Sequence, residues 1–202
     1  MNIQSTYYKC YCTSIEMMRD RKFNVDKKDE LTIDEFLAKF KNDELYYYAT
    51  KSHEDKEDEV NIVYFSKQND SNLKKSDFVT ITNKFKDEKT KEILVDKIIV
   101  VINYKQNNTT SKLILQQFNF IELFQTSQLV INITKHNLVP KHELVEGDEL
   151  TELLKIYNPA EFPILLSNDP IVKYFNYKPK DIIKVTRTDV PNGIEIIYRL
   201  VR

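Results

Sequence analysis

Two histidines, His136 and His142, are the side chains of this sequence that most resemble metal ligands or catalysts. A zinc site needs three or four donors, and the only cysteines, Cys10 and Cys12, lie far from both histidines in the chain. We therefore expect no metal, no cofactor and no catalytic role for either imidazole. The simpler interpretation is that both rings orient a surface segment around Pro140, whose own ring fixes φ. The pattern favours an interaction surface.

Carboxylate and lysine pairs are the residues that nuclease chemistry would require. A metal-dependent nuclease needs carboxylates that converge on a metal beside a lysine, usually with the acid and the lysine one residue apart on a central strand. That spacing occurs at Asp26/Lys28, Glu54/Lys56 and Asp87/Lys89. All three pairs lie in charged, turn-like or helical stretches, where solvated charge is the expected explanation. None lies in an apolar strand run.

Other catalytic signatures are missing from the sequence. Gly147 and Gly193 are the only glycines, so a glycine-rich phosphate loop cannot form. No serine or cysteine has the sequence context of a nucleophile elbow. The sequence therefore predicts a protein without an active site of its own.

Aromatic and basic clusters suggest nucleic-acid contact. The run Tyr46 to Tyr48 could stack bases, but alternation along a strand sends the middle ring to the opposite face, so we expect core packing with a rim hydroxyl. A modest basic cluster surrounds the last predicted strands, at Lys178, Lys180, Lys184 and Arg187. Most such clusters are hydrated surface. We expect weak DNA contact at most from its three lysines.

The overall charge limits nucleic-acid binding further. The 30 basic and 31 acidic residues give a formal charge of -1, without the basic surplus of a protein that mainly grips DNA. Downstream DNA is therefore expected as a weak, salt-sensitive and sequence-independent partner. No apolar run is long enough to span a bilayer, and the N-terminus has no signal-peptide block. We expect a globular protein without membrane contact, in a reducing compartment.

The first 132 residues predict an α/β domain with a mixed sheet. Thr32 and Glu35 form a capping box that starts a helix through Phe40. Apolar periodicity and β-rich runs predict the remaining elements. They are a helix ending near Arg21, strands at 45–50 and 60–65, a helix at 78–85, a strand at 98–104, a helix near 111–117, and strands at 120–124 and 129–133. The apolar run 98–102 should be central in the sheet.

The rest of the chain predicts a small α+β domain. All six prolines fall at or after position 140, so we place the boundary near residue 132, giving domains 1–132 and 133–202. Caps, prolines and a turn pair mark its elements. We expect a helix capped by Asp148, a helix starting at Asp169 and Pro170, and a hairpin of strands 182–185 and 194–201 around Asn192 and Gly193.

One segment of the second domain carries a family resemblance. Residues 129–142, LVINITKHNLVPKH, closely resemble the INITxHxLVPxH signature of eukaryotic RNA polymerase subunit 5. The module is also similar to the archaeal counterpart of that polymerase component. The likeness continues in register at 152–154, 169–175, 183–187 and 198–201, and is looser at 18–23 and 29–40. The chain is therefore identified as a member of that family.

The resemblance implies a fold and a role. It implies a nuclease-like N-terminal jaw domain without nuclease activity, joined to a C-terminal assembly domain that docks on the largest polymerase subunit, with the jaw near downstream DNA. The nucleus is the implied location, or a viral factory or virion for a viral protein. The residues expected to fold or present the docking surface are His136, Leu138, Val139, Pro140, His142, Asp169, Pro170, Tyr174, Arg187 and Arg199.

Two other functions remain open, and two parts of the sequence depart from the family pattern. The alternatives are a metal-dependent nuclease and a free-standing transcription adaptor that carries a polymerase docking module. Asn176 and Lys180 stand where the family usually has glycine, and Thr188 to Pro191 replaces its PSET segment. We expect altered turns there, whereas Gly193 keeps the hairpin plausible.

Overall fold

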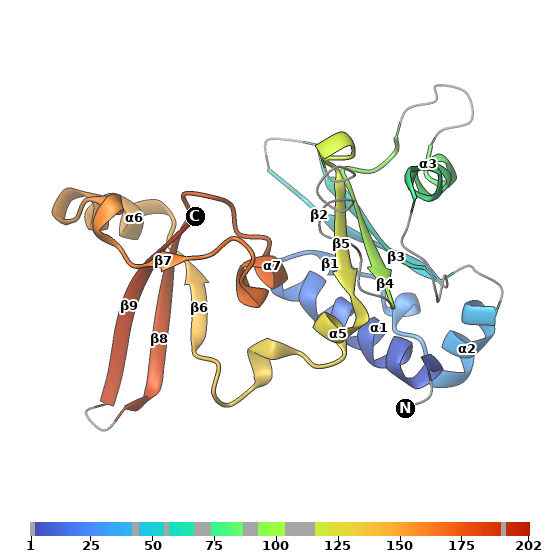
Figure 1. Ribbon diagram of the computed structural model, residues 1–202, viewed down its shortest axis with the longest axis horizontal. Helices are drawn as coiled ribbons and strands as arrows, with labels where there is room; N and C mark the ends of the chain where they lie inside the picture. Colours follow the sequence, from blue (N-terminus) through green and yellow to red (C-terminus); the bar gives the residue numbers. More distant parts are fainter. Residues whose placement is uncertain are drawn as a thin grey trace. The chain divides into compact units, whose positions relative to one another are not determined.

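The computed structural model describes residues 3–41, 45–54, 57–66, 74–86, 93–103, 116–190 and 193–202. The chain separates into two compact units, Met1–Ile131 and Asn132–Arg202. Each unit has its own sheet and helices, which can be followed by colour in Figure 1. The division lies within one residue of the domain boundary expected from the sequence.

The first unit is built on a mixed sheet in the order β1-β2-β3-β4-β5. The pairs β1/β2 and β2/β3 are antiparallel, whereas β3/β4 and β4/β5 are parallel. Its strands are β1 (Asn24–Val25), β2 (Tyr46–Lys51), β3 (Glu59–Phe65), β4 (Lys97–Ile102) and β5 (Ile121–Gln125). Its helices are α1 (Ile3–Asp20), the 3-10 turn η1 (Lys27–Asp29), α2 (Ile33–Lys41), α3 (Lys75–Lys84) and α5 (Thr126–Leu129).

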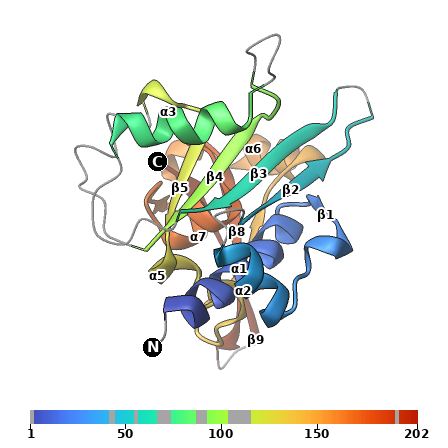
Figure 2. The ribbon, with the colours of Figure 1, turned by 90° about the vertical axis from the view of Figure 1, so that its right-hand side faces the viewer.

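Helices cover both faces of this sheet. Figure 2 shows α3 on one side and α1 with α2 on the other. On the α3 side, Phe78 and Ile81 join a cluster with strand residues such as Ile98. On the α1 side, the Tyr11 ring lies 5.5 Å from the ring of Phe65, centroid to centroid. Ile98 to Ile102 are fully buried in β4, as the predicted central strand requires.

Local sequence signals in this unit are confirmed at two places. Thr32 and Glu35 form the predicted capping box before α2, where the Thr32 N–H donates to Glu35 Oε2 at 2.9 Å. That hydrogen bond lowers the pKa of the Glu35 carboxyl. Tyr47 is 1% exposed and donates to Ser14 Oγ, whereas Tyr46 and Tyr48 are 37% and 47% exposed. The middle ring therefore packs in the core, as alternation predicts.

The predicted strand at 129–133 is wrong. Leu129, fully buried, ends α5, and Asn132 instead begins a 3-10 turn, η2 (Ile133–Lys135). Its Oδ1 accepts a hydrogen bond from the Thr134 N–H at 3.0 Å. A short polar side chain that bonds to the backbone two residues on competes with strand pairing. This local bond outweighs the β-branched composition of the run.

Other expectations differ or fall outside the described residues. The helix expected to be capped by Asp148 has Glu146 at its N-cap, so Asp148 lies in the first turn. The structure does not describe most of the predicted helix at 111–117, the end of the strand at Tyr104, or Lys56, Asp87, Lys89, Pro191 and Asn192.

The second unit is a four-stranded sheet in the order β6-β8-β9-β7 with a helix against each face. Leu153 of α6 packs with Val145 and Ile182 on one face, and Val172 of α7 packs with Ile183 on the other. The predicted hairpin is present as the antiparallel pair β8/β9. The elements are η2, β6 (Lys141–Leu144), α6 (Gly147–Ile156), η3 (Pro159–Glu161), β7 (Ile164–Leu165), α7 (Pro170–Phe175), β8 (Ile182–Val190) and β9 (Gly193–Val201).

Two turns of this unit hold residues in the left-handed region. Asn176, which ends α7, has φ 58°, and Lys180 has φ 82°. Both positions therefore keep a conformation that glycine adopts freely and that other L-residues adopt at a cost. Asparagine tolerates this region better than lysine does, so Lys180 is the more strained of the two.

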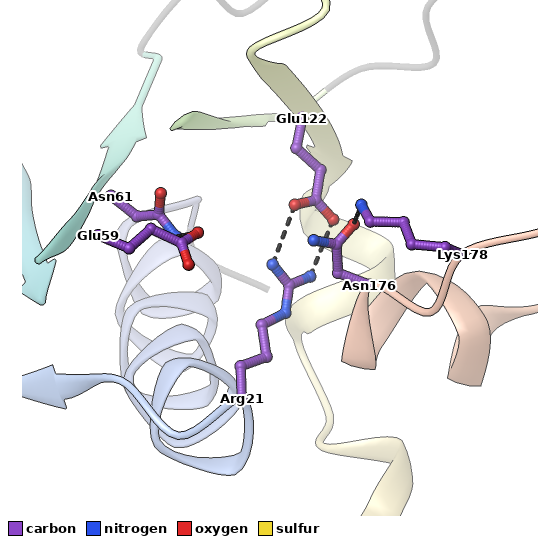
Figure 3. Close-up of polar contacts among 6 residues, drawn as sticks. All are labelled: Arg21, Glu59, Asn61, Glu122, Asn176 and Lys178. Atoms are coloured by element: carbon purple, nitrogen blue, oxygen red, sulfur yellow. Dashed lines mark hydrogen bonds and ion pairs between the residues drawn. The ribbon is translucent and has the colours of Figure 1, made fainter. Parts of the chain in front are cut away.

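A buried ion pair joins distant parts of the first unit (Figure 3). Arg21, just past the end of α1, donates from Nη1 and Nη2 to the two carboxylate oxygens of Glu122 on β5, at 2.9 and 2.8 Å. The two side chains are 4% and 14% exposed. The Arg21 guanidinium also lies 5.9 Å from the centroid of the Phe124 ring. Such a forked pair needs both partners, because removal of one leaves the other charge buried without its ion-pair partner.

We predict that Glu122→Gln lowers the free energy of unfolding by about 3 kcal/mol, because Arg21 then keeps a buried charge without its carboxylate. The matched control is Glu30→Gln, which removes the Arg19–Glu30 pair; Glu30 is 48% exposed. That change should cost at most about 1 kcal/mol. Urea unfolding of both variants, followed by circular dichroism, measures the difference. Equal small effects would show that the buried pair contributes no more than the exposed one.

Candidate docking surface on the second unit

Local hydrogen bonds shape the segment from His136 to His142. His136 Nδ1 accepts from the Leu138 N–H at 3.2 Å, and His142 Nδ1 lies 2.7 Å from the Pro140 carbonyl oxygen, to which it donates. The Val139 N–H donates to the His136 carbonyl at 2.9 Å. Each ring therefore bonds to the backbone two residues away in its own segment. Leu138, 80% exposed, lies at the outside of this turn.

Pairing of β6 with β8 brings His142 onto the sheet face that α7 covers. His142 lies opposite Val185, which belongs to the apolar cluster on that face. Arg187 and Arg199 occupy the same face, because alternate residues of β8 and β9 point to the same side. The structure thus brings together three of the predicted docking residues from separate parts of the chain.

Three other predicted residues build α7 rather than the surface. Asp169 is the N-cap, and its Oδ1 accepts from the Ile171 N–H at 2.8 Å. Pro170 occupies the first helical position, where a missing N–H costs nothing. Tyr174 is 2% exposed and belongs to the core. Their contribution is to hold α7 against the sheet.

Burial and charge act together on His142. Burial lowers the pKa of this imidazole, and the nearby Arg199 and Arg187 lower it further. The hydrogen bond to Pro140 and the charge of Asp169 oppose that shift. His142 is therefore held in its neutral form by its surroundings more strongly than an exposed histidine would be.

The predicted basic cluster is not a continuous free surface. Lys184 Nζ lies 2.8 Å from Glu149 Oε1 on α6, and this contact raises the pKa of Lys184. Lys178 Nζ donates to Asn176 Oδ1 at 2.7 Å (Figure 3). Lys180 is exposed in the turn before β8. Lys184 lies on the α6 face of the sheet, whereas Lys178 and Lys180 lie in the turn between α7 and β8.

Sequence reasoning missed an exposed apolar surface on this unit. Leu153 and Leu154 both belong to the apolar pattern of α6, yet Leu153 is 8% and Leu154 42% exposed. Adjacent helical residues point about 100° apart, so the sequence already indicated that one helix face could not bury both leucines. The large exposed apolar residues of this unit are Leu138, Leu154, Ile156, Tyr157, Ile164, Leu166, Ile194 and Ile196.

Of the three carboxylate–lysine pairs found in the sequence, only Asp26 and Lys28 lie entirely within the described residues. Asp26 and Lys28 form an exposed ion pair at 2.8 Å. Within the described residues, no three histidine, cysteine, aspartate or glutamate side chains are grouped so that they could hold a metal ion. None of the described helices is long and apolar enough to cross a membrane.

Comparison with known proteins assigns the family. The family model of the RNA polymerase Rpb5 C-terminal domain matches residues 131–201. A subunit Rpo5 of DNA-directed RNA polymerase from Archaeoglobus fulgidus is 44% identical over 68 residues, which are 33% of this chain and 90% of that protein. The chain belongs to the RNA polymerase Rpb5 family.

One longer relative extends the likeness over both units. Subunit 5B of DNA-directed RNA polymerases IV and V from Arabidopsis thaliana is 28% identical over 201 residues, covering 96% of this chain and 89% of that protein. The rpabc1 subunit of RNA polymerases I, II and III from Dictyostelium discoideum is 38% identical over 82 residues, 40% of this chain and 42% of that protein. The resemblance found in residues 129–142 is thereby confirmed.

We predict that the second unit of this Rpb5 protein becomes less stable as the pH falls from about 7.5 to about 5.5, because unfolding frees His142 from an environment that lowers its pKa. Below the unfolded pKa of about 6.5, the unfolded state binds the proton more readily. His142→Asn keeps a donor near the Pro140 carbonyl but does not titrate. Urea unfolding at several pH values should show a shallower pH dependence for this variant. An unchanged slope would contradict the assignment to His142.

Proposed function

We propose that this chain is a non-catalytic subunit of a multisubunit DNA-directed RNA polymerase, and that its second unit docks on the largest subunit. The observation that carries the proposal is the match to the archaeal Rpo5 subunit, which covers 90% of that protein with only 33% of this chain. A polymerase subunit can therefore consist of little more than one such module. The first unit is then an addition that docking does not require.

The docking surface that we propose centres on the segment from His136 to His142. Its local hydrogen bonds lower the entropy cost of binding, because the segment is already ordered. Leu138 supplies an exposed apolar anchor, and Arg187 and Arg199 supply charge on the same unit. Asp169, Pro170 and Tyr174 act indirectly by positioning α7.

The first unit serves as a jaw near downstream DNA in this proposal. The chain has a formal charge of -1, so contact with the phosphate backbone has to come from a few local cations. A subunit with this role works in the nucleus, or in a viral factory or virion for a viral protein. A free-standing adaptor with the same docking module differs in being substoichiometric in the purified enzyme.

The docking proposal predicts that substituting His136, Pro140 and His142 together, each by alanine, reduces incorporation into the polymerase at least about tenfold, through lost order and lost contacts at one interface. The measurement is native affinity purification of the tagged full chain, with the stoichiometry of the co-purifying subunits and a promoter-independent transcription assay.

A matched control is the triple variant Asp148→Ala, Glu152→Ala and Lys155→Ala on exposed positions of α6, which should be incorporated like the wild type. Circular dichroism tests whether each variant remains folded. A folded His136, Pro140 and His142 variant with wild-type stoichiometry would refute this docking surface. Absence of the largest subunits from the wild-type purification would refute the subunit function itself.

The charge balance predicts weak DNA binding by the isolated chain, with a dissociation constant above about 10⁻⁵ M at physiological salt and further weakening as salt rises. Fluorescence anisotropy with a labelled duplex of arbitrary sequence measures both. Since Lys184 is paired with Glu149, Lys184→Gln should leave the affinity unchanged. Tight binding at physiological salt, or a strong loss in that variant, would contradict this description.

A further inference from the structure

The outer edge of β9 carries unpaired backbone groups. Backbone groups of successive strand residues point alternately to the two sides. The Val201 N–H donates inward, to the Asp181 carbonyl, whereas the Leu200 N–H donates outward, to the Pro163 carbonyl. By this alternation, Ile194, Ile196 and Tyr198 direct their N–H and C=O groups outward. None of these three has a backbone partner in the described part of the chain.

The chain itself prevents β7 from covering this edge. β7 runs parallel to β9 and pairs only at Ile164 with Leu200 and at Leu165 with Val201. The residue before it, Pro163, has no N–H to continue the ladder, and η3 precedes that proline. The opposite edge of the sheet differs, because the Tyr177 hydroxyl donates to the outward carbonyl of His142 at 3.3 Å.

Beside the open edge, β9 carries apolar side chains on one face of the sheet and charged side chains on the other. Ile194 and Ile196, 70% and 48% exposed, lie on the face toward α6. Glu195 and Arg199 lie on the face toward α7, where Glu195 is 3.8 Å from Arg187. Arg199 forms no ion pair with any described residue. An unpaired edge flanked by exposed β-branched residues is suited to strand addition.

We propose that β9 between Ile194 and Tyr198 receives an extended segment of another polymerase subunit, which adds a fifth strand to this sheet. The segment should be about five residues long, since three outward positions alternate along that length. Complementarity calls for apolar side chains level with Ile194 and Ile196, and for an acidic side chain near Arg199. Only the identity of this partner rests on the proposed function; the open edge does not.

Hydrogen exchange of the full chain, free and within purified polymerase, tests the pairing directly. In the free chain, the amides of Ile194, Ile196 and Tyr198 should exchange quickly, and those of Glu195 and Ile197, which face β8, slowly. In the assembled enzyme the outward amides should become protected. Electron-transfer fragmentation of the peptide that contains β9 resolves the alternate positions.

A matched pair of variants tests the same contact by incorporation. Ile196→Pro removes an outward N–H but no bond of the β8/β9 ladder, so the free chain should still fold. Ile196→Thr keeps the N–H and the branched shape. We expect incorporation of the proline variant to fall about tenfold through lost strand pairing, and that of the threonine variant by no more than about threefold. Unfolding midpoints of the free variants verify folding.

The outcomes separate this inference from the proposed function. Protection of the outward amides together with selective loss in the proline variant supports strand addition. Wild-type incorporation without that protection, or with equal incorporation of both variants, overturns strand addition and leaves the subunit function standing. A chain that is not incorporated, but forms dimers abolished by Ile196→Pro in sedimentation velocity, shows that a second copy fills the edge, which also overturns the inference.

Discussion

The antiparallel ladder between β8 and β9 is the constraint on which the second unit depends. Its register sets Ile182 and Leu200 toward α6 and Ile183 and Val201 toward α7. A slip of one residue would exchange these sets between the two faces, so that both helices would lose their apolar contacts. The same register decides which backbone groups of β9 face outward and which side of the sheet His142 joins through β6.

Short polar side chains start the small helical turns around this ladder. Asn132, Asn158 and Asp169 each accept a hydrogen bond from the N–H two residues later, at 3.0, 3.0 and 2.8 Å. These bonds start η2, η3 and α7, none of which is long enough to be stable alone. A unit of about 70 residues cannot rely on a large core, so local bonds of this kind help to order its short helical elements.

The sequence predicted what depends on near neighbours. The capping box of Thr32 and Glu35, the buried run of β4 and the Asp169–Pro170 helix start are all encoded within a few residues. The segment from His136 to His142, which we propose for docking, was found through its family resemblance, whereas its hydrogen bonds came from the structure. The strand expected at 129–133 failed because Asn132 bonds to its own backbone, a competition that β propensity does not weigh.

Longer-range features could not be read from the sequence. Arg21 and Glu122 are 101 positions apart, so neither residue type indicates its partner. The pairing of Lys184 with Glu149 likewise depends on how α6 packs, and it gives a carboxylate partner to a lysine that the sequence offered for DNA. The open edge of β9 depends on where β7 begins, and Pro163, in a separate segment of the chain, sets that point.

The second unit exposes apolar side chains and an unpaired strand edge, which disfavour a free monomer in water. Ile156, Ile194 and Leu138 are 73%, 70% and 80% exposed, and Ile194 belongs to β9, whose outer edge is uncovered. A formal charge of -1 adds little repulsion between copies. Natural proteins usually protect such edges with charge, proline or a covering segment. In this unit Pro163 instead keeps the covering strand β7 from starting earlier, which is understandable if a partner completes the sheet. The features that would promote aggregation of the free chain are therefore the ones that assembly would use.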